Sequence, residues 1–236
     1  TNSHTLKIAL DFVSEINKTP IIVNDHPGFY TTRVFAKYPC EGMAMLSEGI
    51  KATSIENAGK KAGYPIGPLA VSDEVNIGLI GRIREQMLKY DKSNLKGTWD
   101  NVIDLMVTKL KRKGRSSDAG FYEYPKGEKK YIWQGFEEYF PVATKQIPET
   151  DIIDRLICIQ IIEAIHCYEK NIITTVHDAN IGSVLGWGFP KSTGGVLQFV
   201  NDYGVVQFRD RLIQLAHQYG DRFKPPILLN KMAENK

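Results

Sequence analysis

The chain has 236 residues, and 42% of them are hydrophobic, so it is long and apolar enough to bury a core in one large domain or two small ones. Its 30 Lys and Arg residues stand against 27 Asp and Glu residues, and a net charge of +3 lacks the clustered basicity of a nucleic-acid-binding protein. No apolar run approaches the roughly 20 residues of a membrane span, and residues 1–7 lack the layout of a signal peptide. We therefore expect no nucleic-acid partner, no transmembrane segment and no secretion signal.

The first 25 residues combine a helix with a short strand. Apolar residues recur at helical spacing from Leu6 to Ile16, and the run 21–23 after Pro20 predicts a short buried strand. A lone strand leaves its backbone donors and acceptors unpaired. We therefore interpret residues 1–25 as the edge of a larger domain whose remaining part lies outside this sequence.

A turn over 24–28 separates this edge from a long helical region. The first helix of that region is expected to begin near Phe29 and to be kinked at Pro39. Thr53 and Glu56 have the spacing of a capping box, in which the Thr side chain caps the helix and the Glu side chain reaches back to the cap. Further helices are predicted from Pro68 through Val75, over 79–90 and over 99–111.

Basic residues gather between Lys109 and Arg115, where a glycine-containing segment, 114–122, begins. The pattern predicts an exposed loop closed by a short extended aromatic segment. Residues 127–150 are punctuated by Gly and Pro, which is typical of an irregular linker. The cysteines lie in apolar helical patterns and are expected to be reduced core residues, with no metal site: Cys40, Cys158 and Cys167.

The second half of the chain repeats the first. Arg155 precedes Glu163 by eight residues, as Arg33 precedes Glu41. The other matches are Ile172 with Ile50, 176–179 with 55–58, 188–190 with 63–65, and a second cap pattern at Thr175 and Asp178. Because one such unit alone would bury little apolar surface, we expect the two units to pack together. The predicted fold is all-α, with tandem helical units at 26–126 and 151–236 arranged as a pseudo-dimer.

Three ordered blocks of the sequence resemble the 3-hydroxyacyl-CoA dehydrogenases. Residues 18–33 are similar to the junction between the NAD-binding and helical domains of that family, and residues 114–122 are similar to its third block. The second block is represented by 63–68, Asp73-Glu74-Val75 and Gly78. Two helical units are typical of the multifunctional, trifunctional-type enzymes of fatty-acid β-oxidation, in which the dehydrogenase is fused behind an enoyl-CoA hydratase. The resemblance implies that residues 1–25 are a remnant of the NAD-binding domain and that both units are C-terminal helical domains.

The resemblance also implies an NAD-dependent oxidation of L-3-hydroxyacyl-CoA to 3-ketoacyl-CoA. The fingerprint G-x-G-x-x-G is not found in this chain, and the family's catalytic His-Glu pair belongs to the same NAD-binding domain. We therefore expect no catalytic residue here and no activity of this chain alone, with NAD bound mainly by the other domain. The implied partners are acyl-CoA, the NAD-binding domain, an enoyl-CoA hydratase domain and a thiolase subunit, in the bacterial cytoplasm or in eukaryotic mitochondria or peroxisomes.

Thr32 is the first candidate for contact with the substrate. The resemblance implies this role because many family members carry Asn there, and a Thr hydroxyl can still donate a hydrogen bond. The other interpretation is that Thr31 or Thr32 caps the helix. Gly28 and Phe29 are expected to shape the turn that brings the backbone to the substrate cleft.

Arg33 is expected to pair with a carboxylate of its own domain, and Glu41 lies two turns away. Arg115 and Ser116 in the basic loop are predicted to contact a phosphate-bearing cofactor, since Arg pairs well with phosphate. Relatives usually carry Lys in place of Ser116 and Gly in place of Asp118, so a solvated run of charge is the other interpretation of this loop.

Two other functions fit the same sequence. The helical domain of another β-hydroxyacid dehydrogenase would share the architecture without needing the duplicated unit. A non-catalytic module that dimerises or docks a thiolase subunit would be consistent with the absence of the G-x-G-x-x-G fingerprint from this chain. Specific binding of CoA and acyl-CoA would distinguish a domain that forms one wall of a dehydrogenase's substrate cleft from a domain that serves only as a scaffold.

Overall fold

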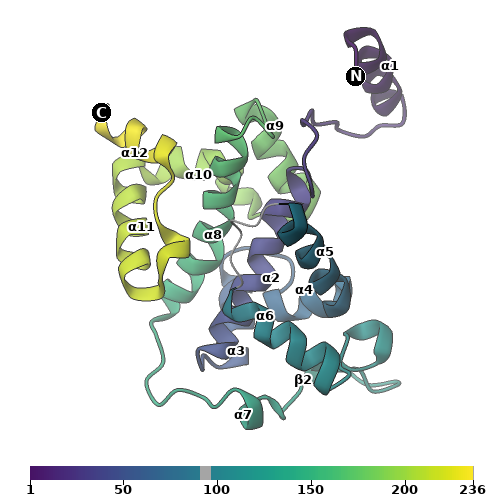
Figure 1. Ribbon diagram of the computed structural model, residues 1–236, viewed down its shortest axis with the longest axis vertical. Helices are drawn as coiled ribbons and strands as arrows, with labels where there is room; N and C mark the ends of the chain where they lie inside the picture. Colours follow the sequence, from purple (N-terminus) through teal and green to yellow (C-terminus); the bar gives the residue numbers. More distant parts are fainter. Residues whose placement is uncertain (91–96, 236) are drawn as a thin grey trace.

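The fold is built from α-helices, as the helical periodicity predicts (Figure 1). The computed structural model describes residues 1–90 and 97–235. Within that part, the one sheet is a pair of short antiparallel strands, β1 (Tyr122–Glu123) and β2 (Tyr131–Ile132). The helices are α1 (Ser3–Glu15), α2 (Thr31–Ser47), α3 (Ala52–Lys61), α4 (Pro68–Val75), α5 (Ile77–Tyr90), α6 (Thr98–Asp104), α7 (Phe136–Tyr139), α8 (Glu149–Glu169), α9 (Val176–Ile181), α10 (Val196–Tyr203), α11 (Val205–Tyr219) and α12 (Ile227–Glu234).

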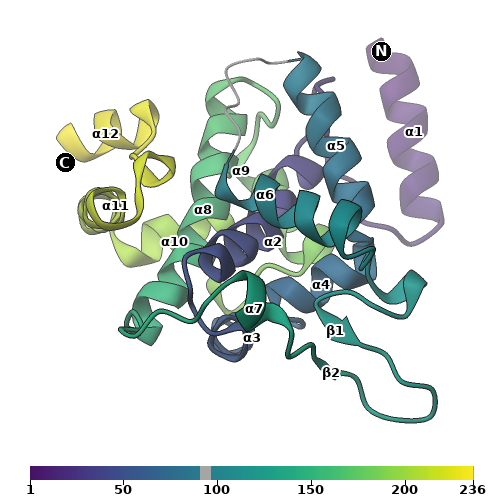
Figure 2. The same ribbon diagram turned by 60° about the horizontal axis from the view of Figure 1, so that its bottom comes forward.

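Helices α2 and α8 pack against each other at the centre of the molecule (Figures 1 and 2). Most of α8 is buried, including Ile152, Leu156, Ile159 and Ile162, which is expected of a helix with protein on all sides. Helices α11 and α12 lie on one side of this pair, and α1 lies on the opposite side (Figure 2). The core is therefore organised around two central helices, one from each predicted unit.

Helix α1 projects away from the body of the molecule (Figure 1). No residue of α1, which is described along its whole length, is buried, and Ile8 and Phe12 are 56% and 59% exposed. Asn2 caps the helix by accepting a hydrogen bond from the Thr5 N–H at 2.8 Å. The predicted helix is therefore present, and its apolar side chains are left largely uncovered.

The predicted strand over 21–23 was wrong. Val23 makes one isolated antiparallel bridge with Ile173, and the Asn24 N–H donates to the Ile172 carbonyl at 2.9 Å. A single bridge does not extend into a ladder, because the chain turns into α9 soon after Ile173. Val23 and Asn24 are thus hydrogen-bonded to the residues that follow α8.

The predicted capping box at Thr53 and Glu56 was also wrong. Helix α3 already begins at Ala52, and in the described chain no side chain caps it. The Glu56 carboxylate is buried and accepts hydrogen bonds from the N–H groups of Leu69 and Ala70, at 2.7 and 3.3 Å. Because Gly67 at the start of α4 has no side chain to cap with, Glu56 caps the neighbouring helix instead.

The order of helices recurs along the chain. The series α2, α3, α4, α5 is followed by α8, α9, α10, α11. Each central helix is followed, two residues after its end, by a left-handed residue: Gly49 with φ 83° after α2 and Asn171 with φ 54° after α8. Asn76, with φ 79°, separates α4 from α5, as Gly204, with φ 91°, separates α10 from α11. This recurrence supports the predicted duplication; the unit boundaries stay a prediction.

Equivalent residues of the two halves also contact each other reciprocally. Gly63 packs on Pro190 and Gly188 packs on Pro65, so closely that an added Cβ would lie 3.1 and 3.2 Å from the proline side chains. Such an exchange of equivalent contacts is what a twofold arrangement of two related units produces. The reciprocal packing supports the pseudo-dimer interpretation.

The remaining helices, the linker, the second cap and the cysteines differ from or agree with the predictions as follows. Helix α2 continues through Pro39, and α6 passes into a π-helical segment, Leu105–Lys109, where one continuous helix was predicted. The predicted linker contains β2 and α7, and α8 begins at Glu149. The cap at Thr175 is confirmed, because its side chain accepts from the Asp178 N–H at 3.0 Å. All three cysteines are buried and free, as predicted.

Candidate functional site

The candidate site begins at the turn that leads into α2. Gly28 and Phe29 both adopt left-handed backbone conformations, with φ of 75° and 46°. A left-handed conformation is costly for a residue with a side chain, and Phe29 is nevertheless 51% exposed. The backbone is thus held in this turn without burial of the Phe29 ring. Helix α2 consequently begins at Thr31, two residues after the predicted start.

Thr32 lies in the first turn of α2 and lines a narrow cavity of about 60 Å³ between α2, α4 and α5. Its neighbours in the wall are apolar, among them Phe35 of α2, Val75 of α4 and Ile80 of α5. Within the described residues no side chain caps α2, so neither Thr31 nor Thr32 acts as its cap. The cap interpretation was therefore wrong, and contact with substrate stays the proposal for Thr32.

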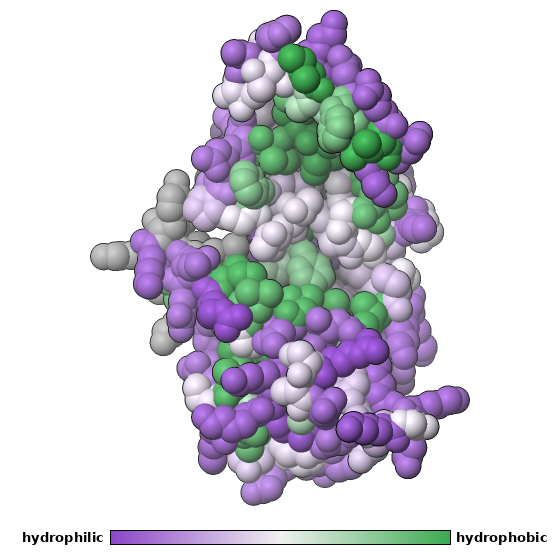
Figure 3. All heavy atoms as spheres, turned by 90° about the vertical axis from the view of Figure 1, so that its right-hand side faces the viewer, coloured by the Kyte–Doolittle hydropathy of each residue, from purple (hydrophilic) through white to green (hydrophobic). Residues whose placement is uncertain are grey.

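Apolar side chains gather on the side of the molecule that carries α1. Figure 3 shows them in the upper part of this face and again across its middle, whereas the lower part is mostly hydrophilic. Exposed apolar residues of the elements on this side include Phe12 of α1, Phe29 of the turn and Leu79 of α5. The turn and α1 thus contribute to an incompletely covered apolar face.

Arg33 follows Thr32 and points toward α8. Its Nε and NH2 atoms lie 2.8 and 2.5 Å from Oε1 of Glu163, and its NH1 atom lies 3.0 Å from Nδ1 of His26. The expected pairing of Arg33 with Glu41 was wrong, because eight residues along one helix separate the two by about 12 Å. Glu41 instead pairs with Arg155, at 2.6 Å. Each ion pair therefore joins an arginine of one central helix to a glutamate of the other.

The electrostatics of the Glu163 pair follow from its neighbours. Burial raises the pKa of the Glu163 carboxyl, but Lys37 and Arg33 outweigh burial and hold this pKa below its ordinary value. Lys37 Nζ lies 3.2 Å from the second carboxylate oxygen. The carboxylate therefore remains charged in the folded protein at neutral pH.

The loop of residues 114–121, which carries Arg115 and Ser116, is held against α4 by Asp73. The Asp73 carboxylate accepts hydrogen bonds from the N–H groups of Phe121 and Tyr122, both at 2.8 Å. Burial raises the pKa of Asp73 to about 6, against the opposing effect of these hydrogen bonds. Sequence reasoning placed Asp73 only in a similar block and missed its role in holding the loop.

Arg115 and Ser116 both have partners within this chain. Arg115 is exposed and pairs with Glu74 at 3.0 Å, and the Ser116 hydroxyl accepts a hydrogen bond from Asn76 Nδ2 at 2.9 Å. Thr32 lines a cavity formed with α4 and α5, while Arg115 and Ser116 contact the C-terminal end of α4 and the residue after it. The described residues contain no parallel sheet of a dinucleotide fold.

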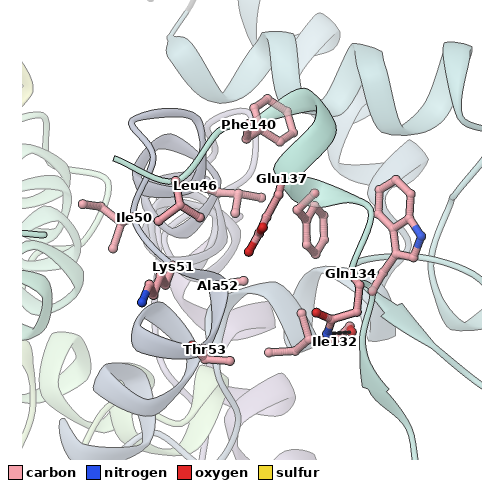
Figure 4. Close-up of a pocket in the computed structure, with 12 residues that line it drawn as sticks. Leu46, Ile50, Lys51, Ala52, Thr53, Ile132, Gln134, Glu137 and Phe140 are labelled. Carbon is pink, nitrogen blue, oxygen red and sulfur yellow. Dashed lines mark hydrogen bonds between the residues drawn. The ribbon is translucent and has the colours of Figure 1, made fainter. Parts of the chain in front are cut away.

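A second cavity, of about 100 Å³, lies at the other end of α2 (Figure 4). Leu46, Ile50 and Lys51 form one side, and Ile132 and Glu137 of the connection to α8 form the other (Figure 4). The length of α2 places this cavity about 24 Å from the first turn of the helix. It is therefore separate from the candidate site at Thr32.

The helical architecture and the turn at the start of α2 define a helical domain with an apolar wall, and known proteins share this fold. The chain superposes on the crystal structure of 3-hydroxybutyryl-CoA dehydrogenase from Escherichia coli with a TM-score of 0.79 and 18% identity, covering 100% of this chain and 66% of that one. It also superposes on the dehydrogenase part of multifunctional enzyme 1 from C. elegans with a TM-score of 0.68 and 20% identity, covering 98% of this chain and 54% of that one.

Sequence comparison adds one family match and several relatives. Residues 28–124 match the family model of the 3-hydroxyacyl-CoA dehydrogenase, C-terminal domain. The chain is 30% identical over 226 residues to the fatty acid oxidation complex subunit alpha of Vibrio vulnificus, covering 95% of this chain and 32% of the relative. The protein of the same name from Idiomarina loihiensis is 30% identical over 239 residues, covering 100% and 33%. The chain thus spans about a third of these relatives.

The comparisons confirm the resemblance drawn from the sequence, while the residues of the site stay proposals. In the described parts of the chain, every helix is too short or too polar to span a lipid bilayer. The sequence did not identify three buried carboxylates that hold neighbouring elements in place: Glu56, Asp73 and Glu163. A carboxylate within an otherwise apolar helical stripe was the available signal for Glu163.

Proposed function

We propose that this chain forms the substrate-side wall of an NAD-dependent 3-hydroxyacyl-CoA dehydrogenase of fatty-acid oxidation. The supporting observation is the start of α2, where Thr32 lies in a first turn that has no side-chain cap among the described residues and borders an apolar cavity. An acyl-CoA thioester has matching parts, namely a carbonyl oxygen that accepts hydrogen bonds and an apolar chain. The proposal places this reaction in the bacterial cytoplasm, or in mitochondria or peroxisomes of a eukaryote.

NAD, when bound to the other domain, would supply the hydride acceptor for C3 of the 3-hydroxyacyl group. The residues of this chain bind and orient the substrate, and the base that takes the hydroxyl proton belongs to a separate NAD-binding domain. Thr32 donates a hydrogen bond to the thioester carbonyl, and the left-handed turn at Gly28 and Phe29 brings the backbone beside it. Phe29 and the apolar wall of α5 exclude water from this side.

Arg115 and Ser116 are proposed to lie on the cofactor side of the same wall. The Ser116 hydroxyl accepts from Asn76 and retains its own proton to donate. Arg115 reaches a phosphate only by leaving Glu74, so the proposal gives it the smaller contribution to nucleotide affinity. Exchange of Arg115 for Gln should therefore raise the KM for NADH less than exchange of Ser116 for Ala.

The experiment joins this chain to an NAD-binding domain placed before Thr1 and follows NADH oxidation by acetoacetyl-CoA. We expect turnover, and Thr32→Ala should lower kcat/KM for acetoacetyl-CoA by about tenfold to a hundredfold, the value of one or two lost hydrogen-bond equivalents. Thr53→Ala is the matched control, because Thr53 is an exposed residue in the first turn of α3. Equal kinetics of the two variants would remove Thr32 from the site, and no turnover by the wild-type fusion would refute the proposed activity.

An assembly role is the second candidate function. An apolar cavity of about 220 Å³ lies between α8, α10 and α12, and Val176 and Met232 at its edge are 45% and 41% exposed. We propose this region as the surface that meets an enoyl-CoA hydratase domain or a thiolase subunit. Titration calorimetry with acyl-CoA separates the two functions, because a scaffold without a substrate wall gives no specific heat of binding.

A further inference from the structure

The segment that carries the candidate site is attached to the second helical unit on both sides of its turn. Before the turn, Val23 bridges Ile173, and Asn24 Nδ2 donates to the Asn171 carbonyl at 2.6 Å. After the turn, Arg33 is held by Glu163. The residues between these two attachments include Gly28 and Phe29, which adopt the left-handed conformations.

A turn of this kind needs support from outside itself. The left-handed backbone of Phe29 is unfavourable for a residue with a side chain and persists only where surrounding contacts fix it. Within the turn, the Phe29 N–H donates to the His26 carbonyl at 2.8 Å. Phe29 as a whole residue is 51% exposed and so contributes little burial of its own. The support must therefore come from the residues that flank the turn.

Tyr30, which is fully buried and donates from its hydroxyl to the Ala179 carbonyl at 3.0 Å, anchors the residue after Phe29. Arg33 adds a second support, and Glu163 holds Arg33. The NH1 atom of Arg33 lies 3.0 and 3.3 Å from the two ring nitrogens of His26, so its guanidinium lies against the start of the turn. The side chains of Arg33 and Glu163 are 10% and 9% exposed, which weakens competition from water. A flexible arginine side chain is thereby confined to one position between α8 and the turn.

We infer that Glu163 is a positioning residue for the substrate wall: through Arg33 it fixes the turn at His26–Phe29 and with it the orientation of Thr32. This inference rests on the proposed function, because Thr32 is its point of contact with substrate. It assigns the second unit a specific part in the site formed by the first unit. Lys37, at 3.2 Å from Glu163, supports the carboxylate from the solvent side.

The reciprocal ion pair supplies a matched control. Glu41 occupies on α2 the place that Glu163 occupies on α8, and it accepts from Arg155 Nε at 2.8 Å. Its further partner is Arg222, at 2.8 Å, and the Arg155 guanidinium packs on the ring of Tyr219. None of these contacts involves the turn. Loss of Glu41 therefore tests the general cost of breaking such a pair.

The experiment compares Glu163→Gln with Glu41→Gln by two measurements. In this chain, hydrogen exchange of the backbone amides of residues 26–32 should become about tenfold faster in Glu163→Gln and should stay within about twofold of wild type in Glu41→Gln. In the fusion with an NAD-binding domain, the KM for acetoacetyl-CoA should rise by about fivefold or more only in Glu163→Gln. Glu163→Asp, which retains the charge, should recover part of both effects, and it replaces Glu163→Gln if that variant does not fold.

Equal exchange at residues 26–32 in the two Gln variants, or none above wild type, overturns the positioning role. Faster exchange with an unchanged KM overturns the link from the turn to substrate binding. If the wild-type fusion does not turn over acetoacetyl-CoA, the proposed function fails, and the exchange measurement still decides whether Glu163 fixes the turn.

Discussion

Asp73 allows a sharp prediction, because burial and hydrogen bonding act on its carboxylate in opposite directions. The residue is 1% exposed and accepts from Phe121, Tyr122 and the Tyr124 hydroxyl. Burial is the larger effect and raises the pKa from 3.8 to about 6. Because the folded-state pKa exceeds the unfolded value, the folded protein binds the proton more tightly. The stability from this proton is full below about pH 4 and is lost as the pH rises through 6, a difference of about 3 kcal/mol.

Asp73→Asn removes this titration. The amide keeps one acceptor oxygen but turns its NH2 group toward a donor, which costs about 1–3 kcal/mol regardless of pH. All other titrating groups are shared with wild type, so they cancel in the difference between the two proteins. We expect the stability advantage of wild type over Asp73→Asn to shrink by up to about 3 kcal/mol between about pH 4 and about pH 7.

Urea unfolding followed by tryptophan fluorescence at several pH values measures this difference. Asp118→Asn is the control, because Asp118 is an exposed carboxylate in the same loop. A wild-type advantage that grows with rising pH would refute the reasoning. It would show that the three hydrogen bonds outweigh burial and that folding makes Asp73 more acidic.

Two further changes test the packing and capping described above. Gly120→Ala should lower the free energy of unfolding by about 2–4 kcal/mol in urea titrations, because its Cβ would lie 2.0 Å from Asp73 Oδ1. Gly127→Ala places its Cβ more than 4 Å from every described atom outside Gly127 and its two chain neighbours, so it should cost no more than about 1 kcal/mol, and equal losses would argue against the clash. Thr175→Ala should lower the melting temperature through a loss of about 1 kcal/mol, and an unchanged melting temperature would show that its bond to Asp178 contributes nothing.

The sequence was sufficient to predict a helical fold, because apolar periodicity and turn residues act locally, and the duplication stays a prediction that the recurring helix order supports. It also selected Thr32, Gly28 and Phe29, whose contact with substrate stays a prediction, and the structure adds only that the backbone is left-handed at Gly28 and Phe29. Partners distant in the chain were not predictable. Arg33 was assigned to Glu41 because the two are close in sequence, whereas helix crossing brings it to Glu163.

The same limit explains the other errors. Glu56 has the spacing of a local cap, and only the approach of α4 shows that it caps another helix. The apolar run 21–23 has strand character, but it meets the chain after α8 at one point only. Strand formation depends on a neighbouring edge, which a single sequence does not reveal.

The complete burial of Arg155 has a consequence for how such a protein can be divided or shortened. Its guanidinium has no exposure, and the carboxylates beside it, Glu41 and Glu48, both come from the first half of the chain. Separation of the two halves would take both carboxylates away from Arg155 and would expose the packed faces of α2 and α8 to water. Each half should therefore be less stable alone than in the joined chain.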